Sequence, residues 1–278
     1  MVRSIVKRFK PAAVIGVGGY SSFPVLRVAQ AKRVPTFIHE SNSFAGKSNM
    51  MLGKKATKIF TGTDGMEKFF PKEKIMVTGN PVRKAITEAL VSRKEGIEFF
   101  SLEESKTTVL VVGGSLGAKS INEAIDKGLD ELLVAGLQII WQTGKPYAEK
   151  GKQRAAGKQG AWVNEFITQM EYAYAAADIV VARAGAMTVA ELCVAKKPVL
   201  FVPYPFAAED HQTVNAMALI KKNAALMVKD TEAKQKLVFM TIELAKDKGK
   251  QEELETNISK LAITDADVKV AEEILKLI

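Results

Sequence analysis

Two short apolar runs lie close together in residues 178–216, and each of them ends at a turn. Residues 179–182 (IVVA) precede the small-residue turn 183–186 (RAGA) and a helical pattern that continues past Glu191. A second apolar run, residues 198–202, ends in a Pro-rich loop. Buried strands that alternate with helices predict a parallel sheet covered by helices, which is an α/β fold. Open parallel sheets bind ligands at the carboxyl ends of their strands, so we expect a binding site at this edge.

Another strand, turn and helix precede this stretch. Residues 107–112 (TTVLVV) run into the glycine turn 113–118 (GGSLGA), and a helical pattern follows. A helix that starts after such a turn offers backbone N–H groups and the positive end of its dipole to a diphosphate. The turn lacks the GxGxxG spacing of dinucleotide-binding proteins, and the Gly-Lys-Ser triplet at 46–48 has Ser41 where a P-loop has its first glycine. The pattern therefore disfavours a nicotinamide cofactor or ATP.

The first part of the chain carries weaker signals of the same kind. The apolar run 12–17 ends in a turn formed by Gly18, Gly19 and Tyr20, which suits either a phosphate loop or a plain tight turn. The strand predicted at 34–39 has polar residues at and just beyond its carboxyl end, which are His39, Glu40, Ser41 and Asn42. A His-Glu pair there suits a general base or hydrogen bonds to sugar hydroxyls. Both histidines of the chain, His39 and His211, fall at predicted strand exits, which favours a function over a solvated loop.

The segment 79–83 (GNPVR) marks a domain border, because a proline biases the residue before it away from helix. We expect an N-terminal domain at 1–83, a second domain at 84–262, and a last helix at about 263–278 that is able to pack back on the first domain. A chain of 278 residues is long enough to bury two ordinary cores.

The net charge of +9 points to an anionic partner, either nucleic acid, anionic lipid or a phosphorylated substrate. Nucleic acid is disfavoured because basic and aromatic residues do not interleave. The single cysteine, Cys193, excludes internal disulfides and suits a reducing cytoplasm. The basic start of the chain loosely imitates a signal peptide, but Pro11 and the glycines after it favour a basic helix followed by a strand.

Several motifs occur together and in order: GVGGY, HESN, GNPVR, GGSLGA, RAGAMTVAEL and FVPYPFAAEDHQTVNA. In this combination the chain closely resembles the MurG glycosyltransferases of glycosyltransferase family 28. The resemblance implies the GT-B fold, in which two Rossmann-like domains with parallel sheets face each other across a cleft. It also implies an enzyme that transfers N-acetylglucosamine from UDP-N-acetylglucosamine to lipid I, with inversion, to form lipid II for peptidoglycan. Such an enzyme works as a peripheral protein on the cytoplasmic face of the bacterial inner membrane.

The resemblance also implies roles for individual residues. On the donor side these are Ser115 at a phosphate, Ile167 presenting its backbone to uracil, Ala186, Met187 and Thr188 at the diphosphate, Glu191 at the ribose, and His211, Gln212 and Asn215 at the transferred sugar. On the acceptor side, Asn42 and Arg83 would lie across the cleft, and Gly18, Gly19 and Tyr20 would face the diphosphate of lipid I. No Asp-x-Asp pair stands at a strand end, so we predict no essential metal and no cofactor.

One departure concerns the start of the chain. Members of the family begin with a strand and a GGTGGH-type loop whose histidine is a leading catalytic candidate, and nothing before Met1 supplies it. The expectation is that roughly the first 80 to 90 residues of a full-length member are missing, so that the N-terminal domain is incomplete. His39 and Glu40 are then the remaining candidates for the catalytic base.

Two other functions remain open at this point. One is a nucleotide-sugar-binding fragment without turnover, and the other is a different enzyme on the same architecture, such as a UDP-sugar epimerase or a lipid galactosyltransferase. For the positive charge, we predict attachment to an anionic membrane through the basic residues near the start, which are Arg3, Lys7, Arg8 and Lys10.

Overall fold

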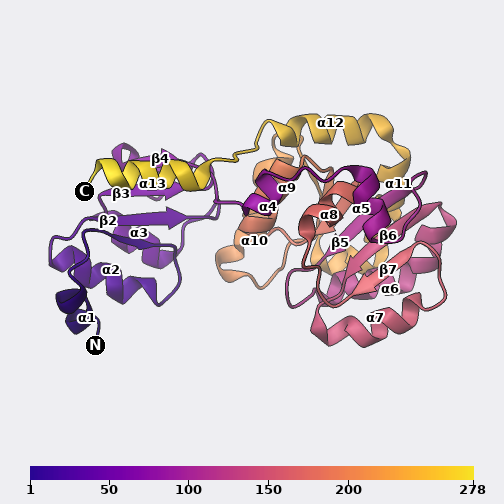
Figure 1. Cartoon of the computed structure of the whole chain (residues 1–278), viewed down its shortest axis with the longest axis horizontal. Helices are drawn as coiled ribbons and strands as arrows, with labels where there is room; N and C mark the ends of the chain where they lie inside the picture. Colours follow the sequence, from indigo (N-terminus) through magenta and orange to yellow (C-terminus); the bar gives the residue numbers. More distant parts are fainter. The chain divides into compact units, whose positions relative to one another are not determined.

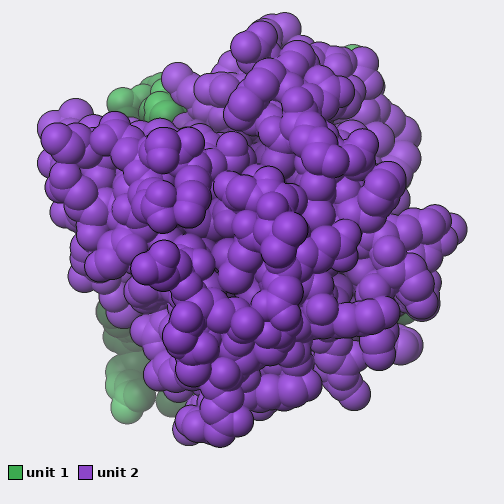
Figure 2. Space-filling model, turned by 90° about the vertical axis from the view of Figure 1, so that its right-hand side faces the viewer, with its two compact units in different colours: residues 1–82, 263–278 green, residues 83–262 purple.

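The structure, a computed structural model, describes residues 1–278 and consists of two compact units (Figure 1). Unit 1 comprises residues 1–82 together with 263–278, and unit 2 comprises residues 83–262. Figure 2 distinguishes the two units by colour. Each unit is a parallel β-sheet with helices packed against it.

Unit 1 contains a sheet of strand order β1-β2-β3-β4, in which all neighbours are parallel. Its elements are α1 (Val2–Phe9), β1 (Val14–Gly16), α2 (Ser22–Ala31), β2 (Thr36–Glu40), α3 (Lys47–Gly53), β3 (Lys58–Thr61), β4 (Ile75–Val77) and α13 (Ala266–Lys276). Leu26, Leu52 and Ile59 from α2, α3 and β3 meet in its core. Between β3 and β4 the chain forms only a short 3-10 turn, Met66–Lys68, because Gly65 before it is left-handed (φ 74°) and Pro71 follows closely.

The C-terminal helix α13 belongs to unit 1 and lies beside β3 and β4 (Figure 1). Lys58 of β3 forms an ion pair with Glu273 of α13, with 3.5 Å between Nζ and Oε1. Ile263, just before the helix, packs so closely on Gly79 that a Cβ there would come within 2.8 Å of it. The chain thus returns to its first unit after completing the second.

Unit 2 contains a sheet of order β10-β9-β8-β5-β6-β7, again entirely parallel. Its strands are β5 (Thr107–Val112), β6 (Leu137–Gln142), β7 (Ala161–Asn164), β8 (Ile179–Ala182), β9 (Val199–Phe201) and β10 (Leu226–Met227). Its α-helices are α4 (Lys84–Thr87), α5 (Arg93–Phe99), α6 (Lys119–Val134), α7 (Ala148–Ala155), α8 (Met170–Ala176), α9 (Ala186–Ala195), α10 (His211–Ile220), α11 (Ala233–Lys246) and α12 (Lys248–Ser259). The chain runs outward from β5 to β7 and then outward from β8 to β10, so the strand order reverses between β5 and β8.

The central strands of unit 2 are buried on both faces, as strands of a parallel sheet covered by helices must be. Val109, Ile139 and Val181 join side chains of α6 and α11 in one core cluster. Helix α5 packs on α8 at Gly96, where a Cβ would come within 2.7 Å of the Tyr172 carbonyl oxygen.

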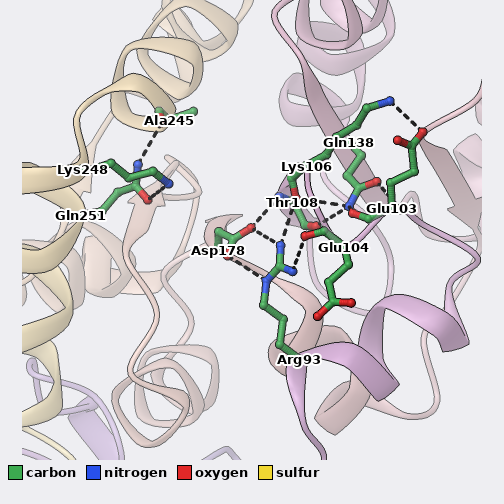
Figure 3. Close-up of polar contacts among 10 residues, drawn as sticks. All are labelled: Arg93, Glu103, Glu104, Lys106, Thr108, Gln138, Asp178, Ala245, Lys248 and Gln251. Atoms are coloured by element: carbon green, nitrogen blue, oxygen red, sulfur yellow. Dashed lines mark hydrogen bonds and ion pairs between the residues drawn. The ribbon is translucent and has the colours of Figure 1, made fainter.

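An arginine ties the amino ends of β5 and β8 together (Figure 3). Arg93 donates from Nε and Nη2 to the Asp178 carboxylate at 3.2 and 3.0 Å. Its Nη1 donates to the Glu104 carbonyl oxygen at 2.8 Å, and its Nη2 donates to the Lys106 carbonyl oxygen at 3.0 Å. The same carboxylate accepts the N–H of Thr108 at 2.8 Å. This clamp, at the edge of the sheet opposite the expected site, anchors α5 and the loop that leads into β5.

Candidate functional site

The carboxyl edge of the unit 2 sheet contains two helix N-termini on either side of the strand-order reversal. Helix α6 follows β5, and helix α9 follows β8, which is the neighbouring strand. The N-cap residues are Ala118 and Gly185, and no side chain caps either helix. The backbone N–H groups of a first helical turn and the positive ends of two helix dipoles attract an anion, and the reversal point is where open sheets bind ligands.

The glycine turn after β5 is shaped by close backbone packing. Gly114 and Gly117 have φ of +88° and +75°, and a Cβ on Gly117 would lie 2.0 Å from the Thr143 carbonyl oxygen. The turn therefore lies directly on the segment that follows β6. Ser115, the predicted phosphate ligand, is exposed at the tip of the turn. Its hydroxyl is free to face a ligand at the N-terminus of α6.

Sequence reasoning missed Gln142, which joins the glycine turn to the loop after β7. Its Nε2 donates to the Gly114 carbonyl at 3.0 Å, and its Oε1 accepts the N–H of Ile167 at 2.9 Å. Ile167 is 3% exposed. The prediction that Ile167 presents its backbone to uracil therefore concerns its carbonyl group, since its N–H is used within the protein.

The predicted diphosphate residues Ala186, Met187 and Thr188 form the first turn of α9. Glu191, further along the same helix, accepts a hydrogen bond from the Tyr174 hydroxyl at 3.0 Å and pairs with Arg83 at 3.3 Å. Burial raises the pKa of Tyr174 well above its ordinary value, so the phenol remains a neutral donor. The role of Glu191 at a ribose stays a prediction.

Arg83 requires a correction. The sequence expectation placed it in the N-terminal domain, facing the donor side from across the cleft. The structure places it at the first position of unit 2, where its guanidinium pairs with Glu191 of α9. The border falls after Val82, one residue earlier than expected, and the role of Arg83 towards a substrate stays a prediction.

The predicted sugar-binding residues lie at the start of α10, but two of them hold loops in place. The Gln212 side chain accepts the N–H of Tyr204 at 2.9 Å. Asn215 is 3% exposed and donates to the Ala184 carbonyl at 3.1 Å, so it supports the turn between β8 and α9, and its contact with a sugar stays a prediction. His211 has Nδ1 2.7 Å from the Ala208 carbonyl oxygen, which can only accept, so Nδ1 donates this hydrogen bond.

His39, one half of the predicted catalytic pair, is inside the protein. Strand β2 extends through Glu40, so His39 lies within the strand and is 4% exposed. Its Nε2 donates to the Gly79 carbonyl at 3.1 Å, and its Nδ1 lies 3.3 Å from Ser41 Oγ, whose hydroxyl donates to it. Burial lowers the pKa of His39, which keeps the ring neutral at pH 7. Both ring nitrogens are therefore hydrogen-bonded within the protein.

Glu40, the other half of the pair, is also 4% exposed. Its Oε1 accepts the N–H of Asn42 at 3.1 Å, and its Oε2 accepts the N–H of Gly46 and the Nδ2 of Asn49 at 3.0 and 2.8 Å. Glu40 thus fixes the loop that carries Asn42. His39 and Glu40 are thus both buried and hydrogen-bonded within unit 1, and a role of either as the catalytic base stays a prediction.

The predicted acceptor loop precedes α2 at the carboxyl end of β1. Gly18 and Gly19 have φ of +92° and +79°, and Tyr20 is 96% exposed. The N-cap residue of α2, Ser21, makes no side-chain capping bond. The geometry suits an anion near the backbone of this loop, and its role towards lipid I stays a prediction.

A second arginine cluster, also missed by sequence reasoning, lies at the carboxyl edge of unit 2. Arg183, directly after β8, pairs with Asp230 and donates to Ser120 Oγ at 3.1 Å. Because these residues are far apart in the chain, no local pattern indicates that they meet.

No group of three or more His, Cys, Asp or Glu side chains is arranged to hold a metal ion. None of the helices combines the length and the apolar character that a membrane span needs.

Comparisons with known proteins agree with this arrangement. The chain matches the glycosyltransferase family 28 N-terminal domain over residues 1–61 and the C-terminal domain over residues 108–272. A relative from Phocaeicola vulgatus, named UDP-N-acetylglucosamine--N-acetylmuramyl-(pentapeptide) pyrophosphoryl-undecaprenol N-acetylglucosamine transferase, is 49% identical over 282 residues, which cover 100% of this chain and 74% of the relative. A crystal structure of Acinetobacter baumannii MurG has a TM-score of 0.81 at 29% identity and covers 99% of this chain and 76% of that one. The complex of S. aureus MnaA with UDP, at 16% identity, covers 100% of this chain and 80% of that one with a TM-score of 0.75 and shares the fold.

The fold and the matched domains define the class of protein, a glycosyltransferase built from two Rossmann-like units with parallel sheets, the GT-B fold. With 49% identity to a relative of which it covers 74%, the chain belongs to the MurG family within glycosyltransferase family 28. The fold class and the family expected from the sequence motifs are thereby confirmed.

Proposed function

We propose that this chain transfers N-acetylglucosamine from UDP-N-acetylglucosamine to lipid I, with inversion at the anomeric carbon, to form lipid II. The observation that carries the proposal is the 49% identity, over the whole chain, to an enzyme named for this transfer. The paired helix N-termini at the carboxyl edge of unit 2 support it, because they are suited to a nucleoside diphosphate.

In the proposed reaction, the acceptor hydroxyl of lipid I gives up its proton to a general base and attacks the anomeric carbon while the bond to UDP breaks. Negative charge then grows on the leaving diphosphate. Fixed dipoles aimed at that charge, from α6, α9 and the exposed hydroxyl of Ser115, stabilise the transition state without reorganising. Unit 2 thus binds the donor and stabilises the leaving group, and unit 1 holds the acceptor at the loop of Gly18 and Gly19.

Calorimetry with UDP and with 2′-deoxy-UDP tests the donor site. Wild type should bind UDP more tightly, and Glu191→Gln should reduce that preference if the carboxylate contacts the ribose hydroxyl. Absence of UDP binding by the wild type would refute the donor site. A transfer assay with a lipid I analogue then separates an active enzyme from a fragment that only binds the nucleotide sugar, and product analysis with UDP-N-acetylglucosamine alone detects an epimerase.

We also infer that α1 attaches unit 1 to the anionic cytoplasmic face of the inner membrane. Met1, Ile5 and Phe9 recur every four residues along the helix and are 99%, 46% and 78% exposed. The basic residues of the same segment are Arg3, Lys7, Arg8 and Lys10. Each basic residue near an anionic surface contributes about 1 kcal/mol of attraction, and exposed apolar side chains enter the interface.

Sedimentation with vesicles, either neutral or containing anionic phosphatidylglycerol, tests this attachment. Binding should require the anionic lipid and weaken with salt, because the attraction is screened. The double variant Lys7→Glu/Arg8→Glu should abolish it. The matched control Lys221→Glu/Lys234→Glu makes the same charge change at exposed positions of unit 2 and should bind like wild type. Equal losses in the two double variants would refute a specific role for α1.

A further inference from the structure

The guanidinium of Arg183 bonds to four residues from three different segments at the carboxyl edge of unit 2. Its Nη1 donates to the carbonyl oxygens of Val202 and Pro203 at 2.9 and 3.1 Å and to the carboxylate of Asp230. Its Nη2 donates to Ser120 Oγ at 3.1 Å, and the Ser120 hydroxyl in turn donates to Asp230. The Arg183 and Asp230 side chains are only 11% and 20% exposed, so the pair is largely shielded from solvent.

Each of the partners stands just beyond a different strand. Ser120 lies in the first turn of α6, which follows β5, and Arg183 itself follows β8. Val202 and Pro203 follow β9, and Asp230 follows β10. The strands β10, β9, β8 and β5 are consecutive neighbours in the sheet, so one side chain joins the loops at the ends of four adjacent strands.

Two of these attachments flank the anion site. Ser120 is the second residue of α6, and Arg183 immediately precedes Ala184 and Gly185, the N-cap of α9. The guanidinium therefore links the two uncapped helix N-termini across the strand-order reversal. Because the planar fork of an arginine donates in several fixed directions at once, it sets the spacing of these N-termini in a way that a single ammonium cannot. Asp230 balances its charge, so the cluster adds little net charge beside the anion.

We propose that Arg183 is a positioning residue for the donor diphosphate, holding the N-termini of α6 and α9 at the separation that the diphosphate requires. The inference rests on the proposed function in one respect, namely that the ligand of this edge is a nucleoside diphosphate. Arg183 acts through the loops that it joins. Preorganised donors bind without the cost of ordering them, and a small misplacement of them weakens binding strongly.

The chain supplies a matched control at the other end of the same strand. Arg93 also bonds to one aspartate carboxylate and two backbone carbonyls, and it also joins β5 to β8, but at their amino ends (Figure 3). Arg93→Met and Arg183→Met therefore remove chemically similar clamps from opposite edges of one sheet. A purely structural role predicts similar effects of both changes on the donor site.

The test measures urea unfolding and the dissociation constant for UDP in both variants. Both should unfold at lower urea concentration, because each change leaves an aspartate without its partner. Arg183→Met loses the hydrogen bonds of the guanidinium, and its dissociation constant for UDP should rise by about tenfold or more. The dissociation constant of Arg93→Met should stay within about twofold of the wild-type value. In transfer assays, the KM for UDP-N-acetylglucosamine should rise in parallel and the KM for the lipid acceptor should not change.

Arg183→Lys keeps the charge beside Asp230 but not the planar fork of donors, and its affinity for UDP should be intermediate. Wild-type affinity in Arg183→Met, or equal losses in the two methionine variants, would overturn the proposal.

Two further measurements keep the proposal testable. If Arg183→Met does not fold, Ser120→Ala removes one link at α6 without changing any charge and should still weaken UDP binding. If the wild type itself does not bind UDP, the proposed function fails. The rate of backbone amide hydrogen exchange then tests the Arg183 clamp independently of any ligand. Exchange in residues 113–118 and 228–232 should then be faster in Arg183→Lys than in wild type and unchanged in Arg93→Met. Unaltered exchange in Arg183→Lys would refute the clamp itself.

Discussion

Replacing Gly117 with alanine should destabilise unit 2 and displace the phosphate turn. Gly117 has φ +75°, a conformation that costs a residue with a side chain about 1–2 kcal/mol. The added Cβ would also lie 2.0 Å from the Thr143 carbonyl oxygen, which belongs to the backbone and is unable to rotate away. Such overpacking typically costs a further ~1–3 kcal/mol, so we expect a total loss of about 2–5 kcal/mol.

A control for this change lies in the same turn. Gly114 has φ +88°, but nothing lies within 4 Å of a Cβ built there. Gly114→Ala should therefore incur only the conformational cost of about 1–2 kcal/mol. The difference between the two variants isolates the close contact with Thr143.

The assay is urea unfolding followed by tryptophan fluorescence. Both tryptophans of the chain, Trp141 and Trp162, belong to unit 2, so the signal reports on the unit that carries the turn. Calorimetry with UDP on the same samples should show weaker binding for Gly117→Ala than for Gly114→Ala. Equal stabilities in the two variants would refute the reasoning, because they would mean that the turn does not rest on the segment after β6.

Two other predictions concern buried titratable groups. Burial lowers the pKa of His39 below its usual 6.5, so the unfolded chain binds this proton more readily and stability should fall as the pH drops below about 6.5, by at most about 1.4 kcal/mol per pH unit. Urea unfolding followed by circular dichroism between pH 5 and 8 should show this slope in wild type and a reduced one in His39→Gln, and identical slopes would contradict it. Burial raises the pKa of Cys193 to about 12, so its thiol should react with a maleimide at pH 7.5 only after unfolding. Rapid labelling of the folded protein would contradict the buried position.

The strands and glycine turns of unit 2 were predictable because their signals are local. An apolar run such as TTVLVV, followed by glycines and then by a helical pattern, favours the same structure in any fold of this class. His39 and Glu40 were harder to place, because the strand ends one residue later than predicted and takes in Glu40, and both side chains are covered by the residues packed over the end of the strand. Burial then decides whether such groups are ligands or supports, and burial depends on what packs over them. Asn215 shows the same effect in unit 2, where a polar residue in a recognisable motif supports a backbone turn.

The amino-acid sequence by itself determined the succession of strands, turns and helices and, through six motifs in order, the family to which the chain belongs. Only the tertiary structure decided the strand order, and with it the reversal between β5 and β8 that brings two helix N-termini together. It alone showed that one guanidinium links them, since Ser120 and Asp230 are 110 residues apart and meet only when the sheet is assembled. Hydrophobic periodicity and turn preferences act over a few neighbouring residues, whereas a clamp of this kind depends on contacts between segments that are far apart in the sequence.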